Sequence, residues 1–229
     1  YDWRDRRITT DGEVDVFETL TYDNLNRIVK AERYDTTEAG HLVARNETHY
    51  DNRSRVFEII RYGIDPSTGT VGNSLEENNW YDAVGNLLKS LPSGSNLFTK
   101  SVYDSIGRVT ARYVGYDADE TSYSDAGSVT DDVILEQTET AYDAASNVLQ
   151  STVRQRYHNA PDTQFGSLGN PSTNPKARVT YQAQWADALG RMIASADYGT
   201  NGGSVLSRPA TIPARSDTVL VTTTVYDPT

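Results

Sequence analysis

The chain of 229 residues contains no cysteine, and this absence excludes a disulfide, a thiolate nucleophile and a zinc ion held by cysteine. Its 3 histidines do not have the His-x-x-x-His or His-x-x-Glu-His spacing of a zinc hydrolase. A Gly-x-Ser-x-Gly nucleophile elbow and a glycine-rich phosphate loop are also missing. The sequence therefore predicts no catalytic, cofactor-binding or metal-binding residues, and we expect that the chain is not an enzyme.

Long hydrophobic runs are absent too, and no stretch is long and apolar enough to be expected to cross a membrane. Hydrophobic residues make up 37% of the chain and the mean hydropathy is −0.60, which is low for a compact core of this length. Phenylalanine contributes only 4 residues, whereas tyrosine contributes 15. Because tyrosine joins an apolar ring to a polar hydroxyl, this composition favours a hollow or single-layer sheet that is wetted on one or both faces.

Positive charge is outnumbered, with 21 Lys and Arg against 32 Asp and Glu, giving a net charge of −11. No basic patch offsets this excess, so we expect neither a nucleic acid nor an anionic membrane as partner. The most acidic stretch covers residues 116–132, where Asp117 and Asp119 have the spacing that opens a calcium loop. Ser122 replaces the invariant glycine and Ser128 the bidentate glutamate of that loop, so a solvated loop without metal is predicted.

The chain does contain a recurring turn signature, which is clearest at Tyr103-Asp104-Ser105-Ile106-Gly107-Arg108. An aspartate at the first position of a type I turn accepts hydrogen bonds from the backbone that follows. A glycine at the fourth position adopts positive φ without steric penalty. The tyrosine then closes one strand, and arginine or asparagine followed by an aliphatic residue opens the next. The signature predicts a tight β-hairpin with a bulge.

The same frame recurs along the chain, with further copies at Tyr1-Asp2 and Tyr226-Asp227 and a degenerate copy at Ala186-Asp187. Such self-similarity is typical of an array whose units stack on their neighbours. Most copies carry aspartate, asparagine or glycine at the fourth turn position, but Ser54 and Ser146 depart from this, so these two hairpins can use a different turn. We assign to the repeated turns Tyr22, Asp23, Asn26, Tyr50, Asp51, Tyr81, Asp82, Gly85, Tyr103, Asp104, Gly107, Tyr142, Asp143, Asp187 and Gly190.

These Tyr-Asp-x-x-Gly-Arg-Val/Leu units resemble the YD-repeat, or Rhs-repeat, family of bacterial Rhs proteins, Tc-toxin shells and teneurin-like proteins. The resemblance covers essentially the whole chain. It implies an all-β fold in which antiparallel β-hairpins join edge to edge into one continuous, curved and spiralling sheet. In that family a self-cleaving Asp-Pro-x-Gly-Leu type motif and a toxin or effector follow at the carboxyl end. Because only Asp227-Pro228 is present here, we expect neither self-cleavage nor toxin activity.

The resemblance implies a structural function. We expect residues 1–229 to be a single repeat array from a longer chain, forming part of the wall of a hollow β-shell around a C-terminal polypeptide cargo. Such a protein would be secreted or on the cell surface, with its targeting signal outside this sequence.

Two further expectations follow from the residues themselves. The alternative function is cell-surface adhesion or carbohydrate binding, in which long loops predicted over residues 63–79 and 158–176 hold a glycan. An open array also has unpaired edges, which we predict near residues 14–22 and 219–226. The isolated chain is expected to self-associate through one of these edges.

Overall fold

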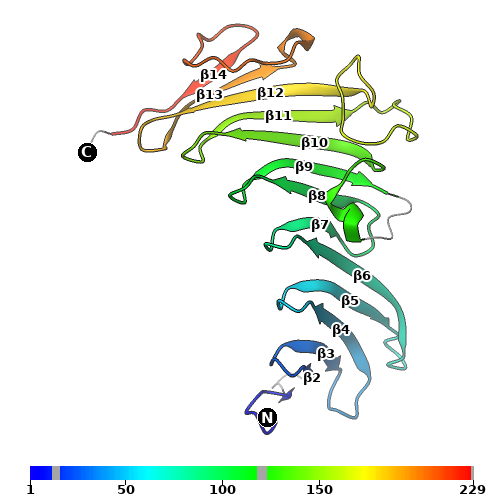
Figure 1. Cartoon of the computed structure of the whole chain (residues 1–229). Helices are drawn as coiled ribbons and strands as arrows, with labels where there is room; N and C mark the ends of the chain where they lie inside the picture. The colour runs from blue at the N-terminus through cyan, green and yellow to red at the C-terminus, as the bar shows by residue number, and fades with distance from the viewer. Residues whose placement is uncertain (12–15, 118–122, 228–229) are drawn as a thin grey trace. The chain divides into compact units, whose positions relative to one another are not determined.

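A computed structural model describes residues 1–11, 16–117 and 123–227 (Figure 1). The predicted fold class is confirmed: the described residues form an all-β fold, an antiparallel sheet of 14 strands whose order follows the sequence. The described residues also form two short 3-10 helices, η1 (Tyr123–Gly127) and η2 (Asn201–Gly203). None of the described helices is long and apolar enough to cross a membrane. The strands are β1 (Thr9–Asp11), β2 (Phe17–Tyr22), β3 (Ile28–Tyr34), β4 (Leu42–Tyr50), β5 (Val56–Ile64), β6 (Val71–Tyr81), β7 (Leu87–Leu91), β8 (Phe98–Tyr103), β9 (Val109–Tyr116), β10 (Val133–Tyr142), β11 (Val148–Arg156), β12 (Ala177–Ala186), β13 (Met192–Gly199) and β14 (Leu220–Thr223).

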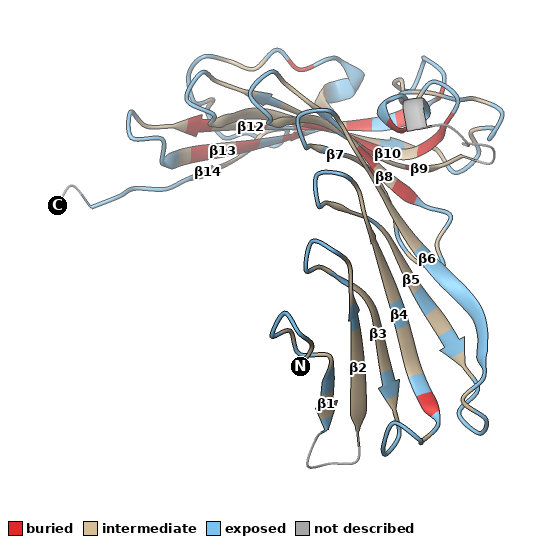
Figure 2. Cartoon of the chain, turned by 60° about the horizontal axis from the view of Figure 1, so that its bottom comes forward, coloured by how far each residue is buried: buried red, intermediate tan, exposed pale blue. Residues whose placement is uncertain are grey.

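The chain divides into two compact units. Unit 1 comprises Tyr1–Tyr81 and Ser90–Asn96, and unit 2 comprises Asp82–Lys89 and Leu97–Thr229. In unit 1 the strands β1 to β6 pair in succession. Leu42 is the one buried residue among the described residues of unit 1, and Figure 2 shows the rest of its strands as half-buried or exposed.

Polar pairs within and between strands cover the faces of unit 1. Lys30 Nζ lies 2.9 Å from Glu32 Oε2, and His49 Nδ1 lies 2.5 Å from Glu58 Oε2 on the neighbouring strand. The Tyr62 hydroxyl donates to Glu47 Oε2 at 3.0 Å. Side chains of this kind can remain in contact with water, so unit 1 is a single-layer sheet that is solvated on both faces.

Unit 2 differs because part of its sheet is covered and has an apolar core. Along β12 the alternate residues Val179, Tyr181, Ala183 and Trp185 are buried, so they share one face of the sheet. Leu206, from the segment after β13, packs against this face. In the same segment Arg208 stacks on the Trp185 ring at 4.8 Å and donates to the Gln184 carbonyl at 2.7 Å. The segment after β13 therefore closes the core.

A second covered region of unit 2 lies where η1 and the residues after it fold onto β8. Lys100, only 3% exposed, donates from Nζ to the Asp125 carbonyl at 2.9 Å, the Ser128 carbonyl at 2.8 Å and Asp132 Oδ2 at 2.8 Å. A buried ammonium ion needs this full set of acceptors. Asp132 is 2% exposed, so the expectation of a solvated loop is wrong for this end of the acidic stretch.

The calcium-loop spacing cannot be followed through the structure, since Asp119 and Ser122 lie outside the described residues. In the part of the chain that the structure describes, no group of three or more His, Cys, Asp or Glu side chains is arranged to hold a metal ion.

The predicted long loop over residues 63–79 is wrong. The structure places most of these residues in β5 and β6, joined by a tight turn in which Asp65 Oδ1 accepts from the Ser67 backbone at 2.8 Å and Gly69 has φ of 69°. Gly63 and Gly72 lie in paired strands, where a β-carbon would come within 3.3 to 3.4 Å of a facing carbonyl. Glycine and acidic residues resemble a loop in the sequence, but a sheet that is solvated on both faces accepts them.

The second predicted loop, over residues 158–176, has no named strand or helix in the structure, as expected. It nevertheless folds back onto the sheet. Leu168 is 4% exposed, and its backbone N–H donates to Gln137 Oε1 at 2.7 Å. Arg154 donates to the Gly169 carbonyl at 2.8 Å. The segment is therefore a packed insertion rather than a free loop.

The edge predicted near residues 14–22 is also wrong in its position. Residues 12–15 lie outside the described residues, and the strand β2 that follows them is paired on its outer side with β1. The first strand in the sheet order is therefore β1. At the other end, β14 pairs with β13 and is the last strand, which agrees with the edge predicted near residues 219–226.

Candidate functional site

The repeated turn has the same backbone hydrogen bonds in successive hairpins. In the turn after β2, the Asn26 N–H donates to the Asp23 carbonyl at 3.3 Å, and the Asp23 N–H donates to the Arg27 carbonyl at 3.0 Å. The register of the β2–β3 pair shifts between Thr21 and Tyr22, which marks a bulge. This is a type I turn followed by a bulge whose first residue is left-handed.

Ser54 and Ser146 form the same turn, so the expectation that they use a different one is wrong. Both adopt a left-handed backbone, and the register shifts at the tyrosine in both hairpins. Serine is an uncommon residue at positive φ. The Ser54 and Ser146 hydroxyls, however, accept hydrogen bonds from Arg27 and Arg108 that glycine could not accept. The φ values at the fourth turn position are 60° at Asp5, 64° at Asn26, 64° at Ser54, 114° at Gly85, 85° at Gly107, 69° at Ser146 and 78° at Gly190.

Each turn aspartate uses both carboxylate oxygens. Asp104 Oδ1 accepts from the backbone N–H groups of Ile106 and Arg108, both at 3.0 Å, while Oδ2 accepts from Arg108 Nε at 2.6 Å. Hydrogen bonds from the Arg108 backbone and side chain hold the pKa of Asp104 below its ordinary value. The Arg6 side chain similarly lowers the pKa of Asp2 to about 2. The pKa values of Asp23, Asp51, Asp82, Asp143 and Asp187 are also lowered.

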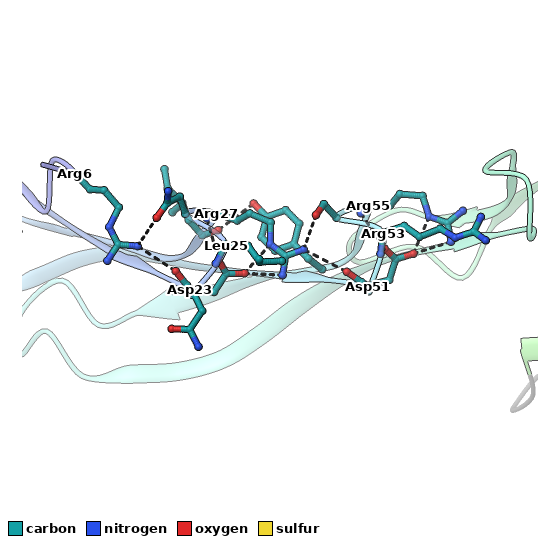
Figure 3. A network of polar contacts seen from close by, with 12 residues as sticks. Arg6, Asp23, Leu25, Arg27, Asp51, Arg53 and Arg55 are labelled. Carbon is teal, nitrogen blue, oxygen red and sulfur yellow. Dashed lines mark hydrogen bonds and ion pairs between the residues drawn. The ribbon is translucent and has the colours of Figure 1, made fainter. Parts of the chain in front are cut away.

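The arginine that closes one turn also holds the next turn, as Figure 3 shows for unit 1. Arg27 donates from Nη1 to the Asp51 carbonyl at 3.3 Å and to Ser54 Oγ at 3.0 Å. Its guanidinium lies 4.5 Å from the centroid of the Tyr50 ring, a cation–π distance. The Tyr50 hydroxyl donates back to the Ile28 carbonyl at 3.0 Å. We call this repeated set of aspartate, arginine and following tyrosine the turn ladder.

The turn ladder recurs wherever arginine follows the left-handed residue. Each of these guanidinium groups binds its own turn aspartate and stacks on the tyrosine of the next hairpin, whose hydroxyl bonds back. The stacking distances are 4.7 Å for Arg6 on Tyr22, 4.6 Å for Arg55 on Tyr81, 4.7 Å for Arg108 on Tyr142 and 4.5 Å for Arg191 on Tyr226. The tyrosine hydroxyls donate to the carbonyls of Arg7, Val56, Val109 and Met192.

Asparagine interrupts the ladder at Asn86 and Asn147. Each amide donates to its own turn aspartate at 2.8 Å, but neither makes a hydrogen bond to the next turn within the described residues. The next left-handed residue is then glycine, either Gly107 or Gly190. After Asn147 the tyrosine is also missing, because Ala186 takes its place. After Asn86 the tyrosine remains, and Tyr103 donates to the Leu87 carbonyl at 2.9 Å.

The structure brings the predicted turn residues together along successive hairpins, where each tyrosine ends a strand and each aspartate starts a turn. Sequence reasoning missed the linking role of Arg6, Arg27, Arg55, Arg108 and Arg191. A signal for it was present, since arginine recurs directly after the left-handed residue. Where arginine is present, the arrangement links one hairpin to the next.

No protein-family model and no curated protein matches the sequence. Among solved structures, the chain is similar to TcdB2-TccC3, with a TM-score of 0.43 and 15% identity over 94% of this chain and 9% of that chain. It is also similar to the Photorhabdus luminescens Tc holotoxin pore, with a TM-score of 0.35 and 12% identity over 85% of this chain and 12% of that chain. Likenesses of this size assign neither a family nor a function by themselves.

Proposed function

We propose that the chain is a non-catalytic structural module, a wall segment of a hollow β-shell that encloses a polypeptide cargo within a longer protein. The observation that carries this proposal is the turn ladder. Each ladder arginine stacks on the next tyrosine, and Arg6, Arg27 and Arg108 also bind the carbonyl and the left-handed residue of the next turn. A sheet built this way extends by adding hairpins and needs no core. Unit 1, where Leu42 alone is buried among the described residues, supports this property.

The state of the turn aspartates supports a non-catalytic role. Their lowered pKa values keep them ionised near neutral pH, so they cannot act as general acids there. Both oxygens of Asp23 and Asp51 are occupied by backbone N–H groups and an arginine. These carboxylates are used in full by the turn.

The cargo in this proposal is the chain's own C-terminal continuation in the parent protein, which we expect to be secreted or displayed on the cell surface. The solved chains that resemble this one are much longer, and it spans only 9 to 12% of the length of those compared above. The adhesion alternative is weaker than at the sequence level, because one of the two loops it depends on, residues 63–79, consists largely of paired strands.

The proposal is tested on the full-length parent protein by limited proteolysis, with mass spectrometry mapping the segment that follows the repeats. We expect that segment to be cleaved at least tenfold more slowly in the intact protein than when it is expressed alone. Replacing two turn aspartates together, Asp51→Ala and Asp104→Ala, should open the wall and increase the cleavage rate.

The matched control is Asp162→Ala, which removes an exposed aspartate that makes no hydrogen bond or ion pair with the described residues and does not belong to a repeated turn. It should leave the cleavage rate unchanged. If the segment is cleaved in the intact protein as fast as the free segment, the wall does not enclose it and the proposed function is wrong.

A further inference from the structure

A small pocket lies in unit 2, where two segments outside the strands come together over β11 and β12. Its volume is about 150 Å³. Arg154 lines it from β11 and Arg178 lines it from β12. Asn170 lines it from the segment after β11, and Val205 lines it from the segment after β13. Pockets for whole drug-sized ligands begin at roughly 300 Å³, so this one fits a single small group of a ligand.

The described lining of this pocket holds two cations and no anion. Arg154 is half-buried, and its Nη2 lies 3.1 Å from Glu139 Oε2, so this carboxylate balances one guanidinium. Arg178 is exposed and makes no ion pair with the described residues. Because the chain carries a net charge of −11, an unbalanced positive charge at a pocket indicates a site that attracts an anion.

The size of this charge excess favours a ligand group with a single negative charge. A phosphate monoester carries about −1.5 to −2 at neutral pH, so the acidic chain would repel it more strongly. A carboxylate carries one charge, and its two oxygens match the planar fork of a guanidinium. Asn170 can donate to the same group, because its Oδ1 already accepts from the Ser172 N–H at 2.8 Å. Its amide nitrogen makes no hydrogen bond to the described residues.

The rest of the lining suits the short aliphatic stem of an acidic side chain. Pro171, Val179 and Val205 line the pocket beside the two arginines. Methylene groups can pack against these apolar residues while the carboxylate at their end contacts the cations. We propose that this pocket binds the side chain of an aspartate or glutamate in a polypeptide. This binding site goes beyond the proposed wall function and does not depend on it.

The test is a titration of the 229-residue chain followed by two-dimensional NMR, with N-acetyl-glutamate amide as the probe and N-acetyl-glutamine amide as its neutral analogue. We expect millimolar binding of the glutamate probe, at least tenfold tighter than binding of the glutamine probe, and weaker binding as salt is added. Arg178→Gln removes the unbalanced charge and should weaken binding of the glutamate probe about tenfold. Because Arg178 makes no hydrogen bond or ion pair with the described residues, this variant should keep the fold intact. Arg178→Lys retains the charge and should weaken binding less than Arg178→Gln does.

The matched control is Arg112→Gln, which removes the same charge from an exposed arginine on β9 that does not line the pocket. Arg112 also makes no hydrogen bond or ion pair with the described residues, and binding should be unchanged in this variant. The proposal is overturned if the glutamate probe does not bind, if both probes bind equally, or if Arg178→Gln binds as tightly as the native chain. It is equally overturned if glucuronate or inorganic phosphate binds tenfold more tightly than the glutamate probe. None of these outcomes affects the wall proposal, which is tested on the cargo.

Discussion

Units 1 and 2 use the same repeated turn but stabilise their sheets differently. In unit 1 most described aromatic residues are half-buried and Phe57 is 40% exposed, while Leu42 is the one buried residue among those described. In unit 2 the segments after β9, β11 and β13 cover parts of the sheet and bury Phe98, Trp185 and Leu206. Figure 2 shows this contrast in the colouring by burial.

The comparison indicates that the turn ladder is sufficient to organise a sheet, and that the insertions add an ordinary core where they occur. Unit 1 carries consecutive ladder contacts from Arg6, Arg27 and Arg55. Unit 2 contains both asparagine interruptions, Asn86 and Asn147, and also contains the apolar cluster around Trp185. The ladder contributes more to the stability of unit 1, and the apolar core contributes more to the stability of unit 2.

Acid should separate the two units most strongly. The folded pKa of Asp2 is about 2 and those of Asp23 and Asp51 are also lowered, against an ordinary value of 3.8. Since the folded values lie below the unfolded ones, this stabilisation is complete above about pH 3.8 and is lost as the pH falls toward 2. Unit 2 also has turn aspartates with lowered pKa values, but acid does not weaken its apolar cluster around Trp185, so unit 1 should unfold at a higher pH than unit 2.

Two-dimensional NMR across this pH range measures the effect, by comparing amide peaks of β2 to β5 with those of β12 and β13. The control variant Asp51→Asn removes one titrating group from unit 1. Its free energy of unfolding should be lower at pH 7 and should fall by a smaller amount on acidification. Simultaneous loss of both sets of peaks would show that the units do not differ in this way.

Truncating a phenylalanine should affect unit 2 far more than unit 1. Phe98→Ala removes a side chain that is 2% exposed and should lower the free energy of unfolding by about 3–5 kcal/mol. Phe57→Ala removes the same atoms from a position that is 40% exposed and should cost about 1 kcal/mol or less. Urea denaturation of both variants provides the comparison, and equal losses would contradict the contrast in burial.

Removing one ladder arginine should destabilise unit 1 although no core contact is lost. Arg27→Ala deletes the ion pair with Asp23, the bonds to the next turn and the stacking on Tyr50. We expect a loss of about 2–3 kcal/mol in urea denaturation. Arg33→Ala is the control, because Arg33 is exposed on β3 and makes no hydrogen bond or ion pair with the described part of the chain. This variant should change the free energy of unfolding by no more than about 0.5 kcal/mol.

Rebuilding the interrupted ladder should slightly raise the free energy of unfolding of unit 2. The double variant Asn147→Arg and Ala186→Tyr supplies the missing guanidinium and the ring it would stack on. The hydroxyl of the introduced tyrosine would donate to the Val148 carbonyl, as the Tyr142 hydroxyl donates to the Val109 carbonyl. We expect about 0.5–1.5 kcal/mol of added stability, and each single change should give much less. A double-mutant cycle by thermal or urea denaturation measures the coupling, and additive single effects would argue against a ladder contact.

The parts of the fold that the sequence predicted depend on local chemistry. Asp104 and Gly107 lie within one turn, and the hydrogen bonds that define it join neighbouring residues, so their spacing can be recognised directly. The φ preference of serine does not predict a left-handed residue at Ser54. The turn is nevertheless formed there, and the Ser54 hydroxyl accepts a hydrogen bond from Arg27 of the preceding hairpin.

The parts that could not be predicted depend on contacts between residues far apart in the sequence. Arg108 meets Tyr142 across an insertion, and insertions of unequal length conceal the constant spatial step between hairpins. The polar residues 63–79 resembled a loop because sequence patterns assume a buried face, which unit 1 does not have. The covering of Trp185 by Leu206 and Arg208 has no local signature at all.

The central claim is that the turn ladder couples each hairpin to the next, and native-state hydrogen exchange of Arg27→Ala tests it most directly. Arg27 belongs to the hairpin of β2 and β3, but its forward contacts are with the hairpin of β4 and β5. We predict that amide protection falls in both hairpins, relative to the native chain and to Arg33→Ala. Loss of protection confined to β2 and β3 would contradict the claim and would reduce the ladder to a set of independent turns.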